Sequence, residues 1–180
     1  MSEILHSKQL DKSEKELQVE IKEYSDEYKE QVKDLIFDVY EKERGRPRKD
    51  RPDLDVIKEI YQANNGNFWL ALKEGKVIGT IGLMNQGKER ASMHRFAVIK
   101  DFRGKEKGVS AKLFSAFLEF AENQGYKKVF LGTWADAVAA MKFYERNGFV
   151  RIESLPEDIA NHMQLVHDKI FYELDLEEDK

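Results

Sequence analysis

The sequence predicts an α/β (α+β) fold: a mixed, mostly antiparallel central sheet of about six to seven strands with helices on both faces. Three observations predict it. Seven segments show the alternation or the short apolar run that is typical of strands. Segments with a helical period of 3.6 residues are interspersed among them, but strands and helices do not alternate strictly. The 180 residues, 41% of them hydrophobic, suffice for one domain with a full core.

Charge and composition exclude several classes of function. The net charge is −4, from 30 basic and 34 acidic residues, so no global positive field favours nucleic acid. Cysteine is absent, which excludes disulfides, thiolate metal sites and a cysteine nucleophile. No apolar run approaches the ~20 residues that span a bilayer, and the first residues lack the apolar core of a signal peptide. We therefore expect a cytoplasmic protein without a membrane partner.

The N-terminal part is predicted to contain an arm, a strand and a helix. Residues 1–15 are rich in lysine and glutamate and predict a flexible arm, so a single domain is expected over 16–180. Residues 17–22 alternate apolar and polar side chains, as a half-buried strand does. Ser25 is placed to cap a helix that extends to about residue 42.

A charged loop over residues 41–52 separates this helix from a second one. Gly45, Pro47 and Pro52 break the helical pattern. The loop carries Lys49 and four arginines: Arg44, Arg46, Arg48 and Arg51. Pro52 then favours the first turn of a helix with the apolar face Leu54, Ile57, Ile60 and Tyr61.

Strands are predicted over 68–72, 76–83 and 91–98, joined by turns at 73–75 and 85–88. Farther on, the pattern predicts a helix ending near 123 at Gly125, a strand over 128–133, and a helix over 135–147 closed by Gly148. Two last strands are expected over 149–152 and 169–176. Phe68 and Trp69 are expected to fill the core.

The stretch from 93 to 113 organises the rest of the chain. An apolar run ends at Val98, a polar loop with Gly104 and Gly108 follows, and a helical pattern starts at once. At such a junction, free backbone N–H groups and the positive end of the helix dipole converge, and glycine lets a phosphate approach. Arg103, Lys105 and Lys107 add positive charge. This predicts a site for a phosphate-bearing cofactor; the alternative is an ordinary basic surface turn.

Three motifs in this order resemble those of the GCN5-related N-acetyltransferase (GNAT) family, over about half of the chain. The stretch 93–113 is similar to the family's motif A, with its Gln/Arg-x-x-Gly-x-Gly/Ala signature. Residues 140–149 are similar to motif B, Ala-x-x-x-Tyr-x-x-x-Gly-Phe, and residues 68–83 resemble the central hairpin. The resemblance implies the GNAT fold and an acetyl-CoA co-substrate.

The resemblance also implies which residues contact coenzyme A. They are Phe96, Ala97 and Val98 at the strand end, and Arg103, Gly104, Lys105, Lys107, Gly108, Val109 and Ser110 in the loop and helix start. The loop is two residues longer than the family pattern, and Ser110 stands where glycine or alanine is usual. Glu106 brings an acid near the phosphates and is expected to point outward.

For protonation of the leaving thiolate, Tyr144 matches the family's tyrosine general acid, whose pKa of ~10 is close to that of a departing thiol. The alternative is a core tyrosine. Ala137 stands where an asparagine often helps to bind coenzyme A. Several family members carry a glutamate as general base where this chain has Ser92. Residues 92, 94, 96 and 98 are expected to share one face of the strand, which makes His94 the nearest titratable substitute. Two alternatives to His94 as the base are equally open: the histidine is simply packed in the fold, or a water chain carries the proton to bulk solvent.

The resemblance therefore implies transfer of an acetyl group from acetyl-CoA to a primary amine of a small molecule or peptide by direct attack. The backbone N–H near Val98 is expected to meet the oxyanion. The acceptor is open: Glu41, Glu43 and Asp55 suit a cationic amine, and Arg44, Arg46 and Arg48 an anionic one, unless the charges are simply solvated. No metal is expected, because His162 and His167 are too isolated.

Two other functions compete with this one. A non-catalytic acyl-CoA-binding module, acting as a sensor or docking domain, is favoured by the missing glutamate at 92 and the missing asparagine at 137. Nucleic-acid binding through residues 44–51 would be steeply salt-dependent. A homodimer is also left open by the resemblance.

Overall fold

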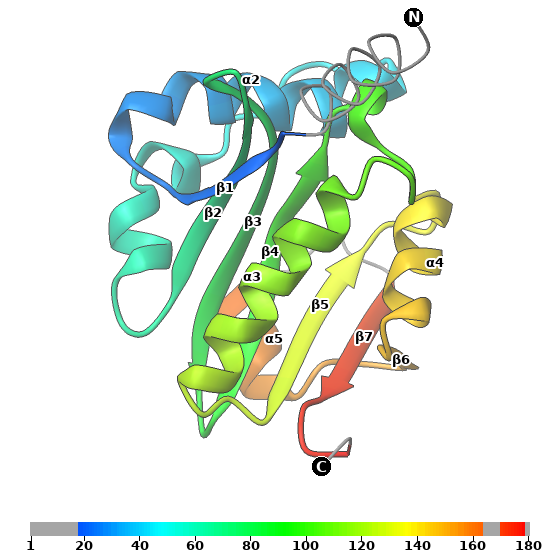
Figure 1. Ribbon diagram of the computed structural model, residues 1–180. Helices are drawn as coiled ribbons and strands as arrows, with labels where there is room; N and C mark the ends of the chain where they lie inside the picture. Colours follow the sequence, from blue (N-terminus) through cyan, green and yellow to red (C-terminus); the bar gives the residue numbers. More distant parts are fainter. Residues whose placement is uncertain (1–17, 164–169, 179–180) are drawn as a thin grey trace, which may run out of the picture.

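A seven-stranded sheet forms the centre of the computed structural model, which describes residues 18–163 and 170–178 (Figure 1). The predicted arm over 1–15 and His167 lie outside these residues. The strands are β1 (Glu20–Glu23), β2 (Asn67–Lys73), β3 (Lys76–Gly87), β4 (Arg90–Val98), β5 (Lys128–Thr133), β6 (Val150–Ile152) and β7 (Ile170–Asp175). Their order is β1-β2-β3-β4-β5-β7-β6, and every neighbouring pair is antiparallel except the parallel pair β4–β5. The predicted mixed, mostly antiparallel sheet is confirmed.

Helices cover both faces of the sheet, as predicted. The α-helices are α2 (Lys29–Tyr40), α3 (Val109–Asn123), α4 (Val138–Arg146) and α5 (Glu157–Met163). Side chains of β2 alternate between two cores: Phe68 and Leu70 pack with α2, whereas Trp69 packs with α3. Phe68 and Trp69 are only 0% and 6% exposed, which confirms that they belong to the core.

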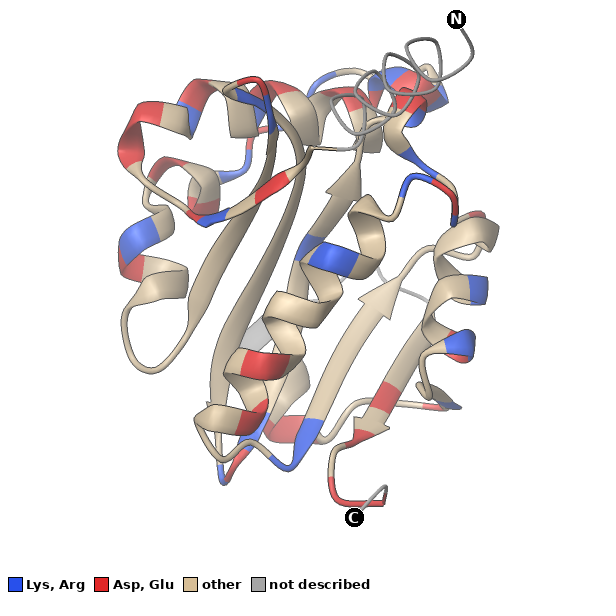
Figure 2. Cartoon of the chain, viewed as in Figure 1, with Lys and Arg blue, Asp and Glu red and all other residues tan. Residues whose placement is uncertain are grey.

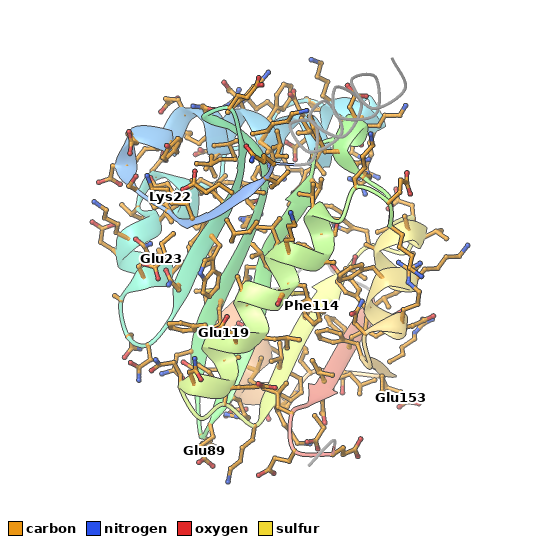
Figure 3. The ribbon with its side chains drawn as sticks, in the orientation of Figure 1. Lys22, Glu23, Glu89, Phe114, Glu119 and Glu153 are labelled. Atoms are coloured by element: carbon orange, nitrogen blue, oxygen red, sulfur yellow. The ribbon has the colours of Figure 1, made fainter. Side chains whose placement is uncertain are left out.

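Phe114 connects α3 to α4 (Figure 3). Its ring centre lies 5.6 Å from that of Phe143 and 5.9 Å from that of Phe149. Gly125 (φ +79°) and Gly148 (φ +89°) take left-handed conformations just after α3 and α4, as their predicted role as helix stops requires.

The two hairpin turns differ in how well they were predicted. Glu74 and Gly75 (φ +51° and +76°) connect β2 to β3 at the predicted place. The turn predicted at 85–88 is wrong: β3 continues to Gly87, and Lys88 and Glu89 form the turn. The strand continues because the Gln86 side chain is buried and donates from Nε2 to the Ser92 hydroxyl, 2.7 Å away.

The predicted second α-helix is also wrong. Residues 52–62 form a 3₁₀ helix, η3 (Pro52–Asp55), and a single wide π turn, η4 (Lys58–Gln62). A π turn has more residues than an α turn, so Ile57 and Tyr61 both face the core while Ile60 is 39% exposed. This places the Tyr61 hydroxyl 2.7 Å from Asp53 Oδ2.

Two further differences lie in the C-terminal half. Helix α4 begins at Val138, three residues later than predicted. Helix α5 was not predicted; Leu155 and Ile159 anchor this segment against Phe130 of β5. In the described part of the chain, no helix combines the length and apolar character that crossing a bilayer requires.

Candidate functional site

A gap between the carboxyl ends of β4 and β5 is the central feature of the site. The two parallel strands pair only at their beginnings, where Arg90–Ser92 face Lys128–Phe130. Beyond Ser92 they diverge (Figure 1), so that their facing edges are not paired with each other. Diverging carboxyl ends of parallel strands are a common place for ligands.

A bulge in β4 beside this gap reverses which side chains of the strand point to each face of the sheet. The register shifts between Thr80↔Ala97 and Gly82↔His94, and Arg95 has φ +51°. Before the bulge, Met93 belongs to the α3-side core; after it, Phe96 and Val98 do. The expectation that residues 92, 94, 96 and 98 share one face is therefore wrong, because a bulge inserts one residue and reverses the alternation.

The backbone of Val98 points into the gap. The Ile99 N–H donates to the Ile78 carbonyl of β3 at 3.0 Å, and Gly79 is paired with Val98. Neighbouring residues of a strand direct their N–H groups to opposite sides, so the Val98 N–H points away from β3. It is thus placed to donate to a carbonyl oxygen that enters between the strands.

The N-terminus of α3 has the features of an anion site. Gly108 caps the helix with φ +69°, and the first turn contains no acid. Within residues 18–163 and 170–178, no side-chain hydrogen bond caps this end of the helix. A Cβ placed on Gly108 would have no atom within 4 Å, so the approach is open. Free N–H groups, the helix dipole and open space fit a diphosphate.

The cations of the loop are not all available to a ligand. Arg103 donates from Nε to the Val98 carbonyl (2.7 Å) and from Nη2 to Glu43 Oε1 (2.7 Å), so it ties the loop to β4 and to the segment after α2. Lys105 and Lys107 are exposed. The Glu106 side chain is exposed, and its carboxylate lies close to Gly104: a Cβ at Gly104 would lie 2.7 Å from its Oε1. The carboxylate therefore rests on the loop itself.

Tyr144 lies beside the end of β4. Its ring centre is 6.4 Å from that of Phe96, and it also packs on Phe149 and Tyr172 at 5.6 and 5.7 Å. The side chain is 6% exposed. Its position next to Phe96 agrees with the general-acid role, and its burial agrees with the alternative core role.

His94 lies on the other face of β4. Its ring packs on that of Tyr61, with centres 6.0 Å apart, and its Nε2 is 2.7 Å from the hydroxyl of the fully buried Ser92. Burial, and next the charge of Arg95, lower the pKa of His94 to about 3. The ring is neutral at physiological pH and is a weak base, which favours the packed histidine over the catalytic base.

An aromatic and arginine cluster joins the end of α2 to the segment after β5, and the sequence singled out only its two arginines, Arg44 and Arg46. Tyr40 at the end of α2 meets Trp134 after β5 edge to face, with ring centres 5.0 Å apart. The Arg44 guanidinium lies 4.8 Å from the Trp134 ring centre. Arg44 Nε and Arg46 Nη2 approach Asp136 Oδ2 at 3.5 and 3.4 Å. These contacts join segments that are far apart in the sequence.

Most of the other charged candidates for acceptor binding are paired. Glu41 receives two hydrogen bonds from Arg51, Asp55 pairs with Lys33 at 2.5 Å, and Arg48 pairs with Asp34 at 3.3 Å. Figure 2 shows charges of both signs interspersed over the helices and loops, whereas β2 and β3 are almost free of charge. Within the described residues, no group of three or more histidines and carboxylates could hold a metal ion.

Comparison with known proteins agrees with this geometry. The family model described as "Acetyltransferase (GNAT) family" matches residues 29–149. N-acetylaspartate synthetase from Xenopus tropicalis is 32% identical over 127 residues, which cover 69% of this chain and 46% of that protein. The probable N-acetyltransferase camello of the same organism is 34% identical over 107 residues, or 57% of this chain and 48% of that one. The chain thus spans about half the length of these curated relatives.

A solved GNAT-family acetyltransferase from Staphylococcus aureus superimposes with a TM-score of 0.81 at 29% identity, over 88% of this chain and 99% of that one. The match extends over the sheet and its covering helices and accounts for nearly all of the bacterial protein. The chain belongs to the GNAT family of acetyltransferases.

Proposed function

We propose that this protein transfers an acetyl group from acetyl-CoA to the primary amine of a small acceptor by direct attack. The observation that carries the proposal is the N-terminus of α3, which has no side-chain cap, next to the diverging carboxyl ends of β4 and β5. The helix terminus and the exposed Lys105 and Lys107 would bind the diphosphate, and the gap would admit the thioester end. Family membership favours this enzyme over a non-catalytic acyl-CoA-binding module.

Two of the chemical requirements, stabilisation of the oxyanion and protonation of the leaving thiolate, have a candidate group beside the gap. The Val98 N–H would stabilise the charge that develops on the carbonyl oxygen, because a fixed donor needs no reorganisation during the reaction. Tyr144 would protonate the departing thiolate. The chain has no cysteine to form a thioester intermediate, so the amine itself would attack.

We further propose that the acceptor amine carries a carboxylate. Several relatives are named N-acetylaspartate synthetase, and the product of such an enzyme carries carboxylates. The Arg46–Asp136 pair at the gap is half-exposed on both sides, so exchanging one carboxylate for another costs little.

Thiol release from acetyl-CoA tests this, with aspartate, glutamate, polyamines and lysine peptides as acceptors. We expect the acidic amino acids to give the highest kcat/KM. Arg46→Ala should raise their KM several-fold, and Arg48→Ala, which removes the pair with Asp34, should not. A preference for polyamines would refute the anionic class. Binding of coenzyme A without thiol release from any acceptor would support the non-catalytic module.

The diphosphate site predicts opposite effects of one substitution on stability and on binding. Ser110→Asp places a carboxylate in the first turn of α3, where it should stabilise the helix by about 0.3–1 kcal/mol. The same charge should repel a diphosphate and weaken coenzyme A binding by about tenfold. Thermal unfolding with and without coenzyme A measures both, and Ser110→Asn is the uncharged control. Unchanged affinity in Ser110→Asp would show that the diphosphate binds elsewhere.

A further inference from the structure

Arg95 has an unusual backbone conformation for a residue inside a strand. Six non-glycine residues of the described chain have positive φ, and the five others lie in turns. A left-handed conformation costs a residue with a side chain about 1–2 kcal/mol. Such a conformation persists only where the surroundings hold it.

Two contacts hold Arg95, one at its backbone and one at its side chain. The Thr80 hydroxyl of β3 donates to the Arg95 carbonyl oxygen at 2.6 Å. The Arg95 guanidinium donates to both oxygens of Asp53, from Nε at 2.9 Å and from Nη2 at 2.7 Å. Asp53 also accepts from the buried Tyr61 hydroxyl, so three donors fix its carboxylate.

Asp53 stays charged in this environment. The side chains of Asp53 and Arg95 are 21% and 22% exposed. Burial alone would raise the pKa of Asp53, but the hydrogen bonds and charge of Arg95 and the Tyr61 hydroxyl bring it below the ordinary value. A charged, bidentate pair of this geometry is directional enough to fix the arginine side chain.

The conformation of Arg95 decides what the gap contains. Its bulge turns Phe96 and Val98 toward the α3 side and leaves His94 on the opposite face. Without the extra residue, the alternation of β4 would carry on and Val98 would face the other core. The orientation of the Val98 N–H therefore depends on Arg95.

We propose that Asp53 is a positioning residue for acetyl transfer: through Arg95 it holds the β4 bulge and so aims the backbone of residues 96–98 into the gap. Asp53 does not touch the reacting atoms. This inference rests on the proposed function for its effect on turnover, but its structural part does not.

The test compares Asp53→Asn with Asp55→Asn, a matched control in the same short helix whose carboxylate is exposed and pairs with Lys33. We expect Asp53→Asn to lower kcat about tenfold, since small misplacements near the reacting atoms are costly. The KM for acetyl-CoA and the thermal shift with coenzyme A should change less than kcat does, because the predicted diphosphate site at the start of α3 is untouched. Asp55→Asn should behave as the wild type.

The same substitution made in an Arg95→Gly variant distinguishes a positioning role of Asp53 from direct action on the substrate. Glycine takes positive φ without strain, so Arg95→Gly should keep the bulge without the ion pair. Adding Asp53→Asn to Arg95→Gly should then change kcat less than twofold. A tenfold loss in this background, or an effect of Asp53→Asn confined to the KM of the acceptor, would mean that Asp53 acts on substrate and would overturn the proposal.

Crystal structures of the variants give a readout that does not need turnover. In Asp53→Asn we expect residue 95 to leave the left-handed region, whereas Asp55→Asn keeps it. A bulge unchanged in Asp53→Asn would refute the inference whatever the activity. If the wild-type protein lacks turnover but the bulge changes as expected in Asp53→Asn, only the proposed function is refuted. If Asp53→Asn does not fold, Arg95→Met removes the same ion pair but keeps a side chain that disfavours positive φ, and it should displace the same bulge; an unchanged bulge there counts equally against the proposal.

Discussion

Replacing Tyr144 by phenylalanine is expected to lower kcat by about two orders of magnitude, the low end of what a positioned general acid contributes. The phenol lies beside Phe96 at the end of β4, on the side of the gap that faces α3 and α4. Loss of its proton leaves the departing thiolate without a donor. The KM for acetyl-CoA should stay within twofold, because the diphosphate site at Gly108 is separate.

Tyr172→Phe is the matched control for this prediction. Tyr172 is fully buried, its ring centre is 5.7 Å from that of Tyr144, and its hydroxyl donates to Glu145 at 2.9 Å. Its removal should cost about 1 kcal/mol of stability and leave kcat nearly unchanged. Steady-state kinetics and thermal unfolding of both variants decide the question. Full turnover by Tyr144→Phe would make Tyr144 a core tyrosine, the alternative that its burial supports.

The stability of the protein is expected to fall steeply on acidification because of His94. Burial, and next the charge of Arg95, lower the pKa of His94 from 6.5 to about 3, although Asp53 opposes this shift. Between these two pH values the unfolded chain binds a proton at this residue and the folded chain does not. The free energy of unfolding should therefore fall by about 1.4 kcal/mol per pH unit from pH 6.5 toward pH 3.

Urea unfolding at a series of pH values measures this slope, and His94→Gln isolates it. Glutamine keeps an amide near the Ser92 hydroxyl but does not titrate, so the variant should lose stability more slowly across the same window. Other titrating groups contribute equally to both proteins and cancel in the difference. Equal slopes would show that His94 is protonated in the folded protein, which would restore it as a candidate base.

The sequence predicted the strands well because their signals are local, and the anion site rests on signals of the same local kind. Alternation placed β2, β4, β5 and β7 to within a few residues, and Gly125 and Gly148 indicated where two helices stop. The glycine of the uncapped α3 terminus is visible in the same way, since helix start and open backbone depend on neighbours in the chain. The π turn at 58–62 was missed because the Tyr61–Asp53 contact selects it, against the helical pattern.

The strands and the glycine-bounded junction between β4 and α3 were thus determined by the sequence alone, because each arises among residues a few positions apart. The faces of β4 around the gap were decided by the tertiary structure. Arg95 is held by Asp53, 42 positions earlier, and by Thr80, 15 positions earlier. Tyr40 likewise meets Trp134 only across the folded sheet. A bulge reverses every following side chain, and no periodicity announces it, because its stabilising contacts exist only once distant segments have packed.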